Sequence, residues 1–439
     1  MQTDIKESTK PGNKTAADSS RFVIRGGKPL AGRIPVQGSK NAALPLLAAT
    51  LLTKETVTLH NVPEIRDVTH LLDIIEALGA TVTRDRNTVT ISAGEVALDK
   101  LPTELVGQLR GSVLLLGSLL GRERRVTLPL PGGDIIGARP IDVHLDAFDQ
   151  LGAKVTQQHD TVVIDGSNLK AGRVVLREFS VTATENALLL AATLPGTTTI
   201  EIAAAEPHVV ALAELLTAMG ATVTGAGTHT ITVEGTEQLG GAAATNIPDM
   251  LEAGLFILLA AGTQSPLDIE HVPVRDLHLF FKKLDDIGVN YHVTGDDASA
   301  TVAVRPAPLR AFKVQTLPQP GIATDLQAPF SVIATQVAGA SLIHDPMYES
   351  RFKHCDELLK MGANVTVCDP HRVIIEGPTT LTGQHIKSLD IRSGATLILA
   401  GLVAQGETVI DDAHIIDRGY ERLAERLKAI GADIERVAE

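Results

Sequence analysis

The sequence is poor in the residues that stack on nucleic-acid bases and that hold metals. It contains no tryptophan, 3% aromatic residues and two cysteines among 439 residues. Proteins that bind single-stranded nucleic acid combine aromatic platforms with a basic surface, so this composition and the net charge of −13 disfavour that class. Cys355 and Cys368 have no neighbouring metal-ligand spacing, and we expect two reduced, partly buried thiols.

Long hydrophobic runs are also absent. The longest, such as Val113–Leu116, Ala187–Thr193 and Leu255–Ala261, fall short of the roughly 18 residues that a membrane span needs. Residues 1–20 are polar and lack an apolar signal-peptide core, so they predict a disordered tail. With 44% hydrophobic residues, the chain can bury a core of two or three domains, and we expect a globular, cytoplasmic protein that does not span a membrane.

No cofactor signature stands out. The 14 histidines include no HExxH or paired ligand spacing, and neither a Walker A sequence nor a strand-anchored GxGxxG is present. We therefore expect no metal, ATP or dinucleotide cofactor, and no obligate protein partner is indicated.

A repeat of about 70 residues runs through the chain. In each copy an amphipathic helical stretch ends at a glycine and an alternating strand follows, as in "ALGATVTRDRNTVTISAG". A glycine in this place predicts a left-handed helix cap, and the pattern predicts a unit of helix, glycine, strand, turn and strand. The six glycines are Gly79, Gly152, Gly220, Gly288, Gly362 and Gly431.

Each repeat opens with a polar cluster followed by a helix that is apolar nearly all round, as in "SKNAALPLLAATLL". Such helices are expected to be buried, so their polar N-terminal ends should surface together. Three repeats would close into one barrel-like domain, and six into two. Because helix N-termini carry free N–H groups and partial positive charge, ends that face one cleft would bind anions.

The alternative interpretation is a scaffold whose polar helix starts are only caps. Caps are usually Ser, Thr, Asp or Asn, whereas Lys40, Arg110 and Arg392 place cations at the positive ends of helices. This local misfit favours a functional site.

Several motifs resemble those of the UDP-N-acetylglucosamine 1-carboxyvinyltransferases, the MurA family of enolpyruvyl transferases. They are "GSKNAALPLLAA", "PGGDIIGARPIDVH", "ATDLQAPF", "ESRFKH" and "IIDRGYERL", which occur in the family's order from about Arg21 to the C-terminus. The resemblance implies an α/β fold of two inside-out, barrel-like domains with three repeats each. One domain would comprise 21–39 plus 249–439, and the other 40–248 with a mobile loop at about 128–140.

The resemblance also implies an activity. The enolpyruvyl group of phosphoenolpyruvate would pass to the 3′-hydroxyl of UDP-N-acetylglucosamine, with release of phosphate, by addition and then elimination. This reaction is the first committed step toward peptidoglycan precursors in the cytoplasm, and so concerns cell wall biogenesis, cell shape, cell division and the cell cycle. It needs a base for the hydroxyl, an acid for the methylene carbon and cations for phosphate and carboxylate.

The site residues are transferred from the family position by position. Asp325 matches the base, Asp134 occupies the place of the proton donor, and Lys40 and Arg418 match catalytic cations. The matching substrate-binding positions are Asn41, Arg110, Arg139, Pro140, Ile141, Asp142, Val143, Ser180, Val181, Met347, Arg351 and Arg392.

Two of these residues have ordinary structural alternatives. Asp325 alone could be an N-cap, and Arg418 could pair with Asp417 or Glu421 on a solvated helix face, where ion pairs contribute about 0–1 kcal/mol. Their joint occurrence with the other motifs favours the functional interpretation.

Three positions depart from the family pattern. Asp134 stands where most members have the cysteine that fosfomycin alkylates, Thr182 replaces a glycine, and Ser350 replaces an asparagine. A carboxyl group has an unperturbed pKa of about 3.9, so Asp134 must be desolvated to act as an acid. A carboxylate is a poor nucleophile toward an epoxide, and we expect insensitivity to fosfomycin.

Two other functions remain open. A 5-enolpyruvylshikimate-3-phosphate synthase would use the same donor and fold but a smaller, phosphorylated acceptor, and "GARPIDVH" is not its pattern. A catalytically silent paralogue would bind the UDP-sugar without turnover.

Overall fold

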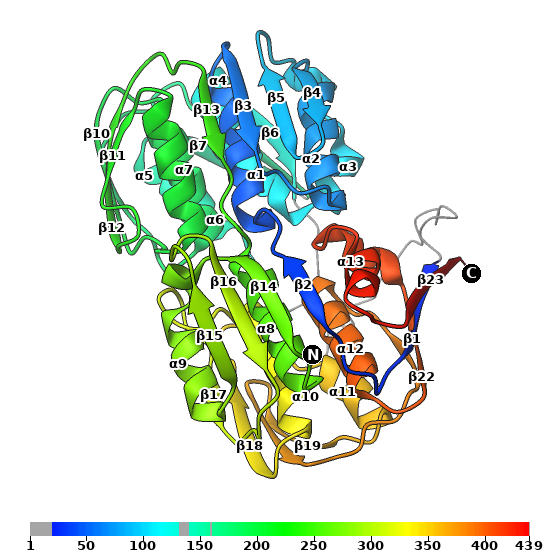
Figure 1. Cartoon of the computed structure of the whole chain (residues 1–439). Helices are drawn as coiled ribbons and strands as arrows, with labels where there is room; N and C mark the ends of the chain where they lie inside the picture. The colour runs from blue at the N-terminus through cyan, green and yellow to red at the C-terminus, as the bar shows by residue number, and fades with distance from the viewer. Residues whose placement is uncertain (1–19, 131–139, 159, 439) are drawn as a thin grey trace, which may run out of the picture.

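The computed structural model describes residues 20–438 apart from 131–139 and 159. The predicted tail therefore lies outside the described residues except for Ser20, which begins the first strand. The chain forms two lobes (Figure 1). Residues 20–38 and 249–438 form the lower lobe of the figure, and 40–247 form the upper lobe. The two crossings meet at an isolated antiparallel bridge between Gly38 and Pro248.

Each lobe contains three buried helices with amphipathic helices outside them. The upper lobe has α1 (Lys40–Ala49), α2 (Arg66–Ala77), α3 (Thr103–Gln108), α4 (Leu115–Glu123), α5 (Asp142–Gln150), α6 (Val181–Ala191), α7 (Pro207–Ala218), η1 (Thr50–Leu52), η2 (Leu98–Lys100) and η3 (Arg110–Leu114). The lower lobe has α8 (Met250–Gly262), α9 (His278–Ile287), α10 (Gln327–Thr335), α11 (His354–Lys360), α12 (Ile391–Val403), α13 (Leu423–Ala429), η4 (Val274–Asp276), η5 (Thr324–Leu326) and η6 (Ala413–Arg418).

Three separate sheets surround the helices of the upper lobe. In spatial order they are β13 (Ala242–Thr245), β3 (Thr56–His60), β5 (Thr88–Ser92) and β4 (Thr81–Asp85); β6 (Arg125–Pro129), β8 (Thr161–Asp165) and β7 (Lys154–Gln158); and β11 (Thr222–Thr224), β12 (Thr230–Gly235), β10 (Gly196–Glu201) and β9 (Arg173–Val175).

The lower lobe repeats this arrangement with three four-stranded sheets. In spatial order they are β21 (His385–Lys387), β22 (Glu407–Asp411), β1 (Ser20–Arg25) and β23 (Ile434–Ala438); β15 (Asn290–Thr294), β16 (Ala300–Arg305), β14 (Leu267–Val272) and β2 (Gly32–Pro35); and β17 (Lys313–Gln315), β18 (Gly339–His344), β20 (Arg372–Gly377) and β19 (Asn364–Asp369).

Every four-stranded sheet has the same pairing: one parallel edge strand and three antiparallel strands. In the last sheet the N-terminal strand β1 lies between β22 and β23, with Ile24 opposite Thr408 and Ile434. The first strand thus completes the sixth repeat. Within the described residues the sheets stay separate around the helices, so the domains are barrel-like only in outline and no closed barrel forms.

The six predicted helix-end glycines are confirmed as left-handed. Their φ angles lie between 87° and 116°, a region that L-residues with a Cβ rarely adopt. The residues are Gly79, Gly152, Gly220, Gly288, Gly362 and Gly431.

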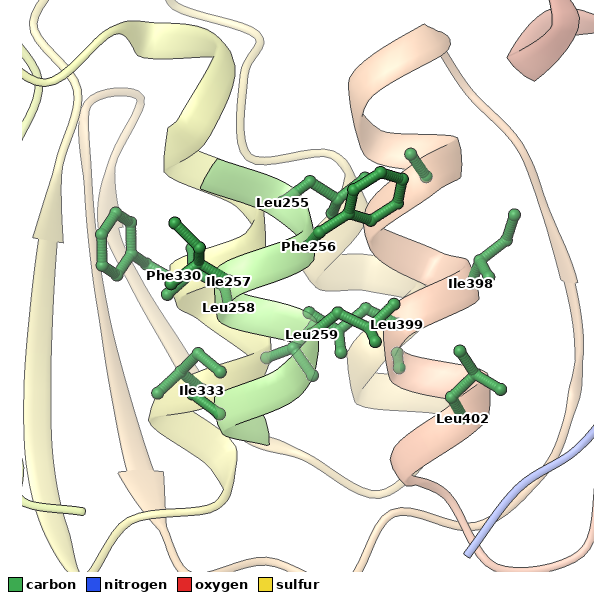
Figure 2. Close-up of a cluster of buried hydrophobic side chains, with 14 of the residues drawn as sticks. Leu255, Phe256, Ile257, Leu258, Leu259, Phe330, Ile333, Ile398, Leu399 and Leu402 are labelled. Carbon is green, nitrogen blue, oxygen red and sulfur yellow. The ribbon is translucent and has the colours of Figure 1, made fainter. Parts of the chain in front are cut away.

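The buried helices form the centre of each lobe. In the lower lobe α8, α10 and α12 pack against one another, and all 13 residues of α8 are buried (Figure 2). Each fully buried Leu, Ile or Phe side chain contributes about 1.5–3 kcal/mol relative to exposure. This core holds the three helix starts in fixed positions. Of the two free cysteines, Cys355 is buried as expected, but Cys368 is exposed because it lies on the solvent side of β19.

Candidate active site

The starts of all six buried helices line one cavity of about 570 Å³. Its walls come from both lobes, so it lies between them. The expectation that the polar helix starts surface together is therefore confirmed. The lining residues at these starts include Lys40 on α1, Arg110 on η3 before α4, Ser180 before α6, Met250 on α8, Asp325 on η5 before α10 and Arg392 on α12.

Short polar residues cap several of these helices. Ser39 and Ser180 accept hydrogen bonds from the N–H groups of Ala42 and Ala183, and Asp390 forms a capping box with Ser393. The caps satisfy the backbone, so Lys40 and Arg392 occupy the first turns as extra charges. Carboxylates elsewhere in the fold neutralise both cations.

One carboxylate, Asp67, lies between two predicted catalytic cations. Its oxygens lie 2.7 Å from Lys40 Nζ and 3.0 Å from Arg418 Nε, and its side chain is 3% exposed. Burial alone would raise the pKa of Asp67, but Lys40 and Arg418 outweigh it and hold that pKa below the usual value. Asp67 and Lys40 belong to the upper lobe and Arg418 to the lower lobe, so this cluster joins the lobes.

The predicted base, Asp325, lies in a second cluster. Arg351 Nη2 is 2.5 Å from Oδ1, and Arg392 Nε is 3.1 Å from Oδ2. Burial again favours a higher pKa, but the two guanidinium groups outweigh it and hold the pKa of Asp325 well below its usual range. Asp325 is not an N-cap, since Ala323 precedes η5 and the carboxylate faces the arginines.

Asp345 fixes the backbone on both sides of this cluster. Its fully buried carboxylate accepts hydrogen bonds from Thr324 Oγ1 at 2.5 Å and from the Met347 N–H at 2.9 Å. It therefore ties the segment that carries Asp325 to the segment that carries Met347 and Arg351.

The upper-lobe wall carries further predicted ligand positions. Arg110 Nη2 lies 3.5 Å from the Pro140 carbonyl oxygen. Beside them, burial, and secondarily Arg110, lowers the pKa of His144 to about 3, so its ring is neutral at pH 7.

Most described site predictions lie on the cavity wall. These residues are Lys40, Asn41, Arg110, Pro140, Ser180, Val181, Asp325, Met347, Arg351, Arg392 and Arg418. Ile141, Asp142 and Val143 are not part of the described lining; they lie at the start of α5, where Ile141 and Val143 pack into the core. Asp134 and Arg139 lie outside the described residues.

Five acidic residues and two histidines of the wall were not among the predicted site residues: Asp67, Glu178, Glu185, Glu206, Asp390, His144 and His208. Asp67 resembles an ordinary first-turn acid of α2, and Glu185 lies in an apolar helix. Glu185 is 1% exposed, and burial, followed by repulsion from Glu206, raises its pKa well above the usual value. His208 has its pKa lowered by burial, which outweighs the opposing charges of Glu206 and Asp325. A buried Glu within an apolar run was the one available signal.

Within the described residues, no group of three or more His, Cys, Asp or Glu side chains could hold a metal ion. A helix long and apolar enough to cross a membrane is likewise missing from the part of the chain that the structure describes.

Comparison with known proteins gives consistent matches. The profile of the EPSP synthase (3-phosphoshikimate 1-carboxyvinyltransferase) family matches residues 24–427. Proteins named UDP-N-acetylglucosamine 1-carboxyvinyltransferase from Magnetococcus marinus and Koribacter versatilis are 43% and 40% identical; each match covers 95% of this chain and 99% or 97% of the relative.

Solved structures match the fold. The enolpyruvyl transferase NikO from Streptomyces tendae aligns with a TM-score of 0.85 at 26% identity, over 96% of this chain and all of that one. EPSP synthase from Acinetobacter baumannii gives 0.74 at 20% identity over 96% and 100%, which supports the fold alone. The expected enolpyruvyl transferase-like fold is confirmed.

Proposed function

The chain belongs to the UDP-N-acetylglucosamine 1-carboxyvinyltransferase family, and we propose that it catalyses the reaction in that name. It transfers the enolpyruvyl group of phosphoenolpyruvate to the 3′-hydroxyl of UDP-N-acetylglucosamine and releases phosphate. The observation that carries this proposal is the single cavity at six helix starts, where four cations and two carboxylates form two clusters.

The cations suit the donor. Phosphoenolpyruvate carries a phosphate and a carboxylate, and guanidinium groups bind both in bidentate fashion. We assign these groups to Arg351 and Arg392 on one side and to Lys40 and Arg418 on the other, with Asn41 beside Lys40. Because Asp67 and Asp325 already pair with these cations, the donor's anionic groups compete with carboxylates for them.

The upper-lobe wall suits the acceptor. Arg110 and the first turn of α6, which begins at Val181, offer N–H donors to the nucleotide diphosphate, and Ser180 caps that turn. The segment from Arg139 to Val143 and the Met347 backbone complete the proposed acceptor contacts.

The addition then needs two proton transfers, and the elimination needs a third. Asp325 takes the proton of the 3′-hydroxyl, and the oxygen attacks C2 of phosphoenolpyruvate. Asp134 delivers a proton to C3, which gives a tetrahedral phospho-ketal. Return of a proton from that methyl group to the Asp134 carboxylate and departure of phosphate restore the double bond.

The finer physiological assignments follow from the product. We propose a cytoplasmic enzyme whose product enters peptidoglycan synthesis, so that its loss would affect cell shape, cell division and the cell cycle. Insensitivity to fosfomycin follows from Asp134 in place of cysteine.

Phosphate release tests the function. The purified protein should release phosphate from phosphoenolpyruvate with UDP-N-acetylglucosamine and not with shikimate 3-phosphate. Release with the second acceptor would indicate EPSP synthase activity. Tight binding of the UDP-sugar with no release from either would indicate the silent paralogue.

A further inference from the structure

Thr182 on α6 ends a series of hydrogen bonds that begins in the core. The series runs from Gly117 on α4 through Asn186 on α6 and His144 on α5 to Thr182, which lies on the cavity wall. Asn186 and His144 are 0% and 2% exposed, so each polar atom needs a protein partner.

The donor and the acceptor of every hydrogen bond in this series can be assigned. The Gly117 N–H donates to Asn186 Oδ1 at 2.7 Å, which fixes the orientation of the amide. Asn186 Nδ2 therefore donates its two protons, one to the Val113 carbonyl oxygen at 3.0 Å and one to His144 Nδ1 at 2.8 Å.

This arrangement sets the tautomer of His144. Because Nδ1 accepts a hydrogen bond, the neutral ring carries its hydrogen on Nε2, and burial keeps the ring neutral by lowering its pKa. Nε2–H then donates to Thr182 Oγ1, which lies 3.3 Å away. The hydroxyl oxygen is occupied as an acceptor, and its own proton remains available for the cavity.

We propose that Thr182 is a ligand-binding residue that donates this proton to a diphosphate oxygen of UDP-N-acetylglucosamine; the assignment rests on the proposed function of the cavity. Thr182 is the second residue of α6, whose first N–H groups have no acceptor within the helix. Arg110 lies on the same wall. The free N–H groups of this turn and the Arg110 guanidinium are donors, which suits an oxyanion, and the raised pKa of Glu185 on the same helix keeps that acid neutral.

The series of hydrogen bonds from Gly117 through Asn186 and His144 to Thr182, here called the relay, explains why these buried polar groups occur together. A Cβ on Gly117 would lie 2.6 Å from the Asn186 carbonyl oxygen and 2.7 Å from its Oδ1, so glycine allows this close approach. A glycine at 182 would leave His144 Nε2–H without its hydroxyl acceptor. In this chain Thr182 both satisfies the histidine and extends the donor set to the ligand.

Calorimetry with three ligands tests the proposal. Thr182→Val keeps the side-chain shape but removes the hydroxyl. This variant should bind UDP-N-acetylglucosamine and UDP about tenfold or more weakly, as expected for the loss of a hydrogen bond to a charged group. Its affinity for phosphoenolpyruvate should be unchanged. Thr182→Ser, which keeps the donor, should restore affinity to within about threefold. Thr217→Val on α7, whose hydroxyl bonds only to the Ala213 carbonyl, is the matched control outside the cavity.

The outcomes separate this inference from the proposed function. Unchanged UDP affinity in folded Thr182→Val overturns the role of Thr182 even if the wild type turns over. If the variant binds UDP-N-acetylglucosamine more weakly but UDP equally well, Thr182 contacts the sugar, and the diphosphate assignment is wrong. If the wild type binds neither UDP compound, the proposed function itself fails. Nitrogen-15 spectra of His144 should show Nε2–H, and a proton on Nδ1 would contradict the relay.

Discussion

The pairing of Asp325 with two arginines predicts that donor binding changes its strength as a base. An opposite charge within about 4–6 Å lowers the pKa of a carboxyl group by about 1–3 units, and the guanidinium contacts here are 2.5 and 3.1 Å. Bound phosphoenolpyruvate would bring one of its two anionic groups to these same guanidinium groups. We therefore expect the pKa of Asp325 to rise when the donor binds, by at least about one unit, or about 1.4 kcal/mol.

A pH profile shows whether the pKa of Asp325 rises or falls when the donor binds. A base acts only when ionised, so the rate falls as the pH drops through its pKa. At saturating acceptor, kcat/KM for phosphoenolpyruvate reports the form without donor, where the arginines hold the pKa of Asp325 low. The turnover number kcat reports the donor complex. The acid limb of kcat should therefore lie at least about one pH unit above that of kcat/KM.

The assay is steady-state phosphate release from pH 3 to pH 8, with both substrates varied. In this range kcat/KM should stay flat at the acid end, because the arginines hold the pKa of free Asp325 well below its usual range, whereas kcat should begin to fall. Asp325→Asn keeps the shape, should lower kcat by about 10²–10⁴, and should lose the limb in its residual activity. Circular dichroism checks that this variant is folded. Coincident acid limbs in the wild type would refute the competition between substrate and Asp325 for the arginines.

Three further predictions follow from the described contacts and the loop sequence. Asp67→Ala removes the buried carboxylate that two partly buried cations share and should lower the free energy of unfolding in urea by about 3 kcal/mol. Exposed Asp99→Ala should change it by less than about 0.5 kcal/mol. Gly220→Ala should lower the free energy of unfolding by about 1–2 kcal/mol, because φ at Gly220 is 116°. Gly94→Ala should lower it less, because Gly94 has equally open surroundings but no positive φ. Equal losses for the two variants would contradict the explanation from backbone conformation. Asp134→Asn should abolish turnover while UDP-N-acetylglucosamine still binds by calorimetry, and time-dependent inactivation of the wild type by fosfomycin would contradict the role of that carboxyl group.

The repeat made much of the fold predictable, because it appears in local patterns. Periodic apolar residues and a glycine every 70 residues or so mark the helices and their ends, and each lies within a few residues of its cause. The separation of the sheets was not predictable, because strand pairing depends on contacts far apart in sequence, such as β1 with β22 and β23.

In the site, too, residues marked by a local pattern were predictable, and contacts between distant residues were not. A cation at the positive N-terminal end of a helix is electrostatically unfavourable, and this local signal indicated Lys40, Arg110 and Arg392. Arg418 gave no such signal: its neighbour Asp417 pairs with Arg436 instead, and Glu421 accepts a hydrogen bond from the Glu64 N–H. The partner of Arg418 is Asp67, 351 positions away, and only the packing of the two lobes brings them together.

The two carboxylate clusters differ in how they depend on the lobes. Asp325, Arg351 and Arg392 all belong to the lower lobe, so their pairing requires only that lobe's packing. Asp67 instead links Lys40 of the upper lobe to Arg418 of the lower lobe. A phosphate that bridges Lys40 and Arg418 would occupy the electrostatic place that Asp67 now fills, and would favour the same approach of the lobes. Donor binding and lobe closure are thus expected to reinforce each other, because both require these two cations to face one anion.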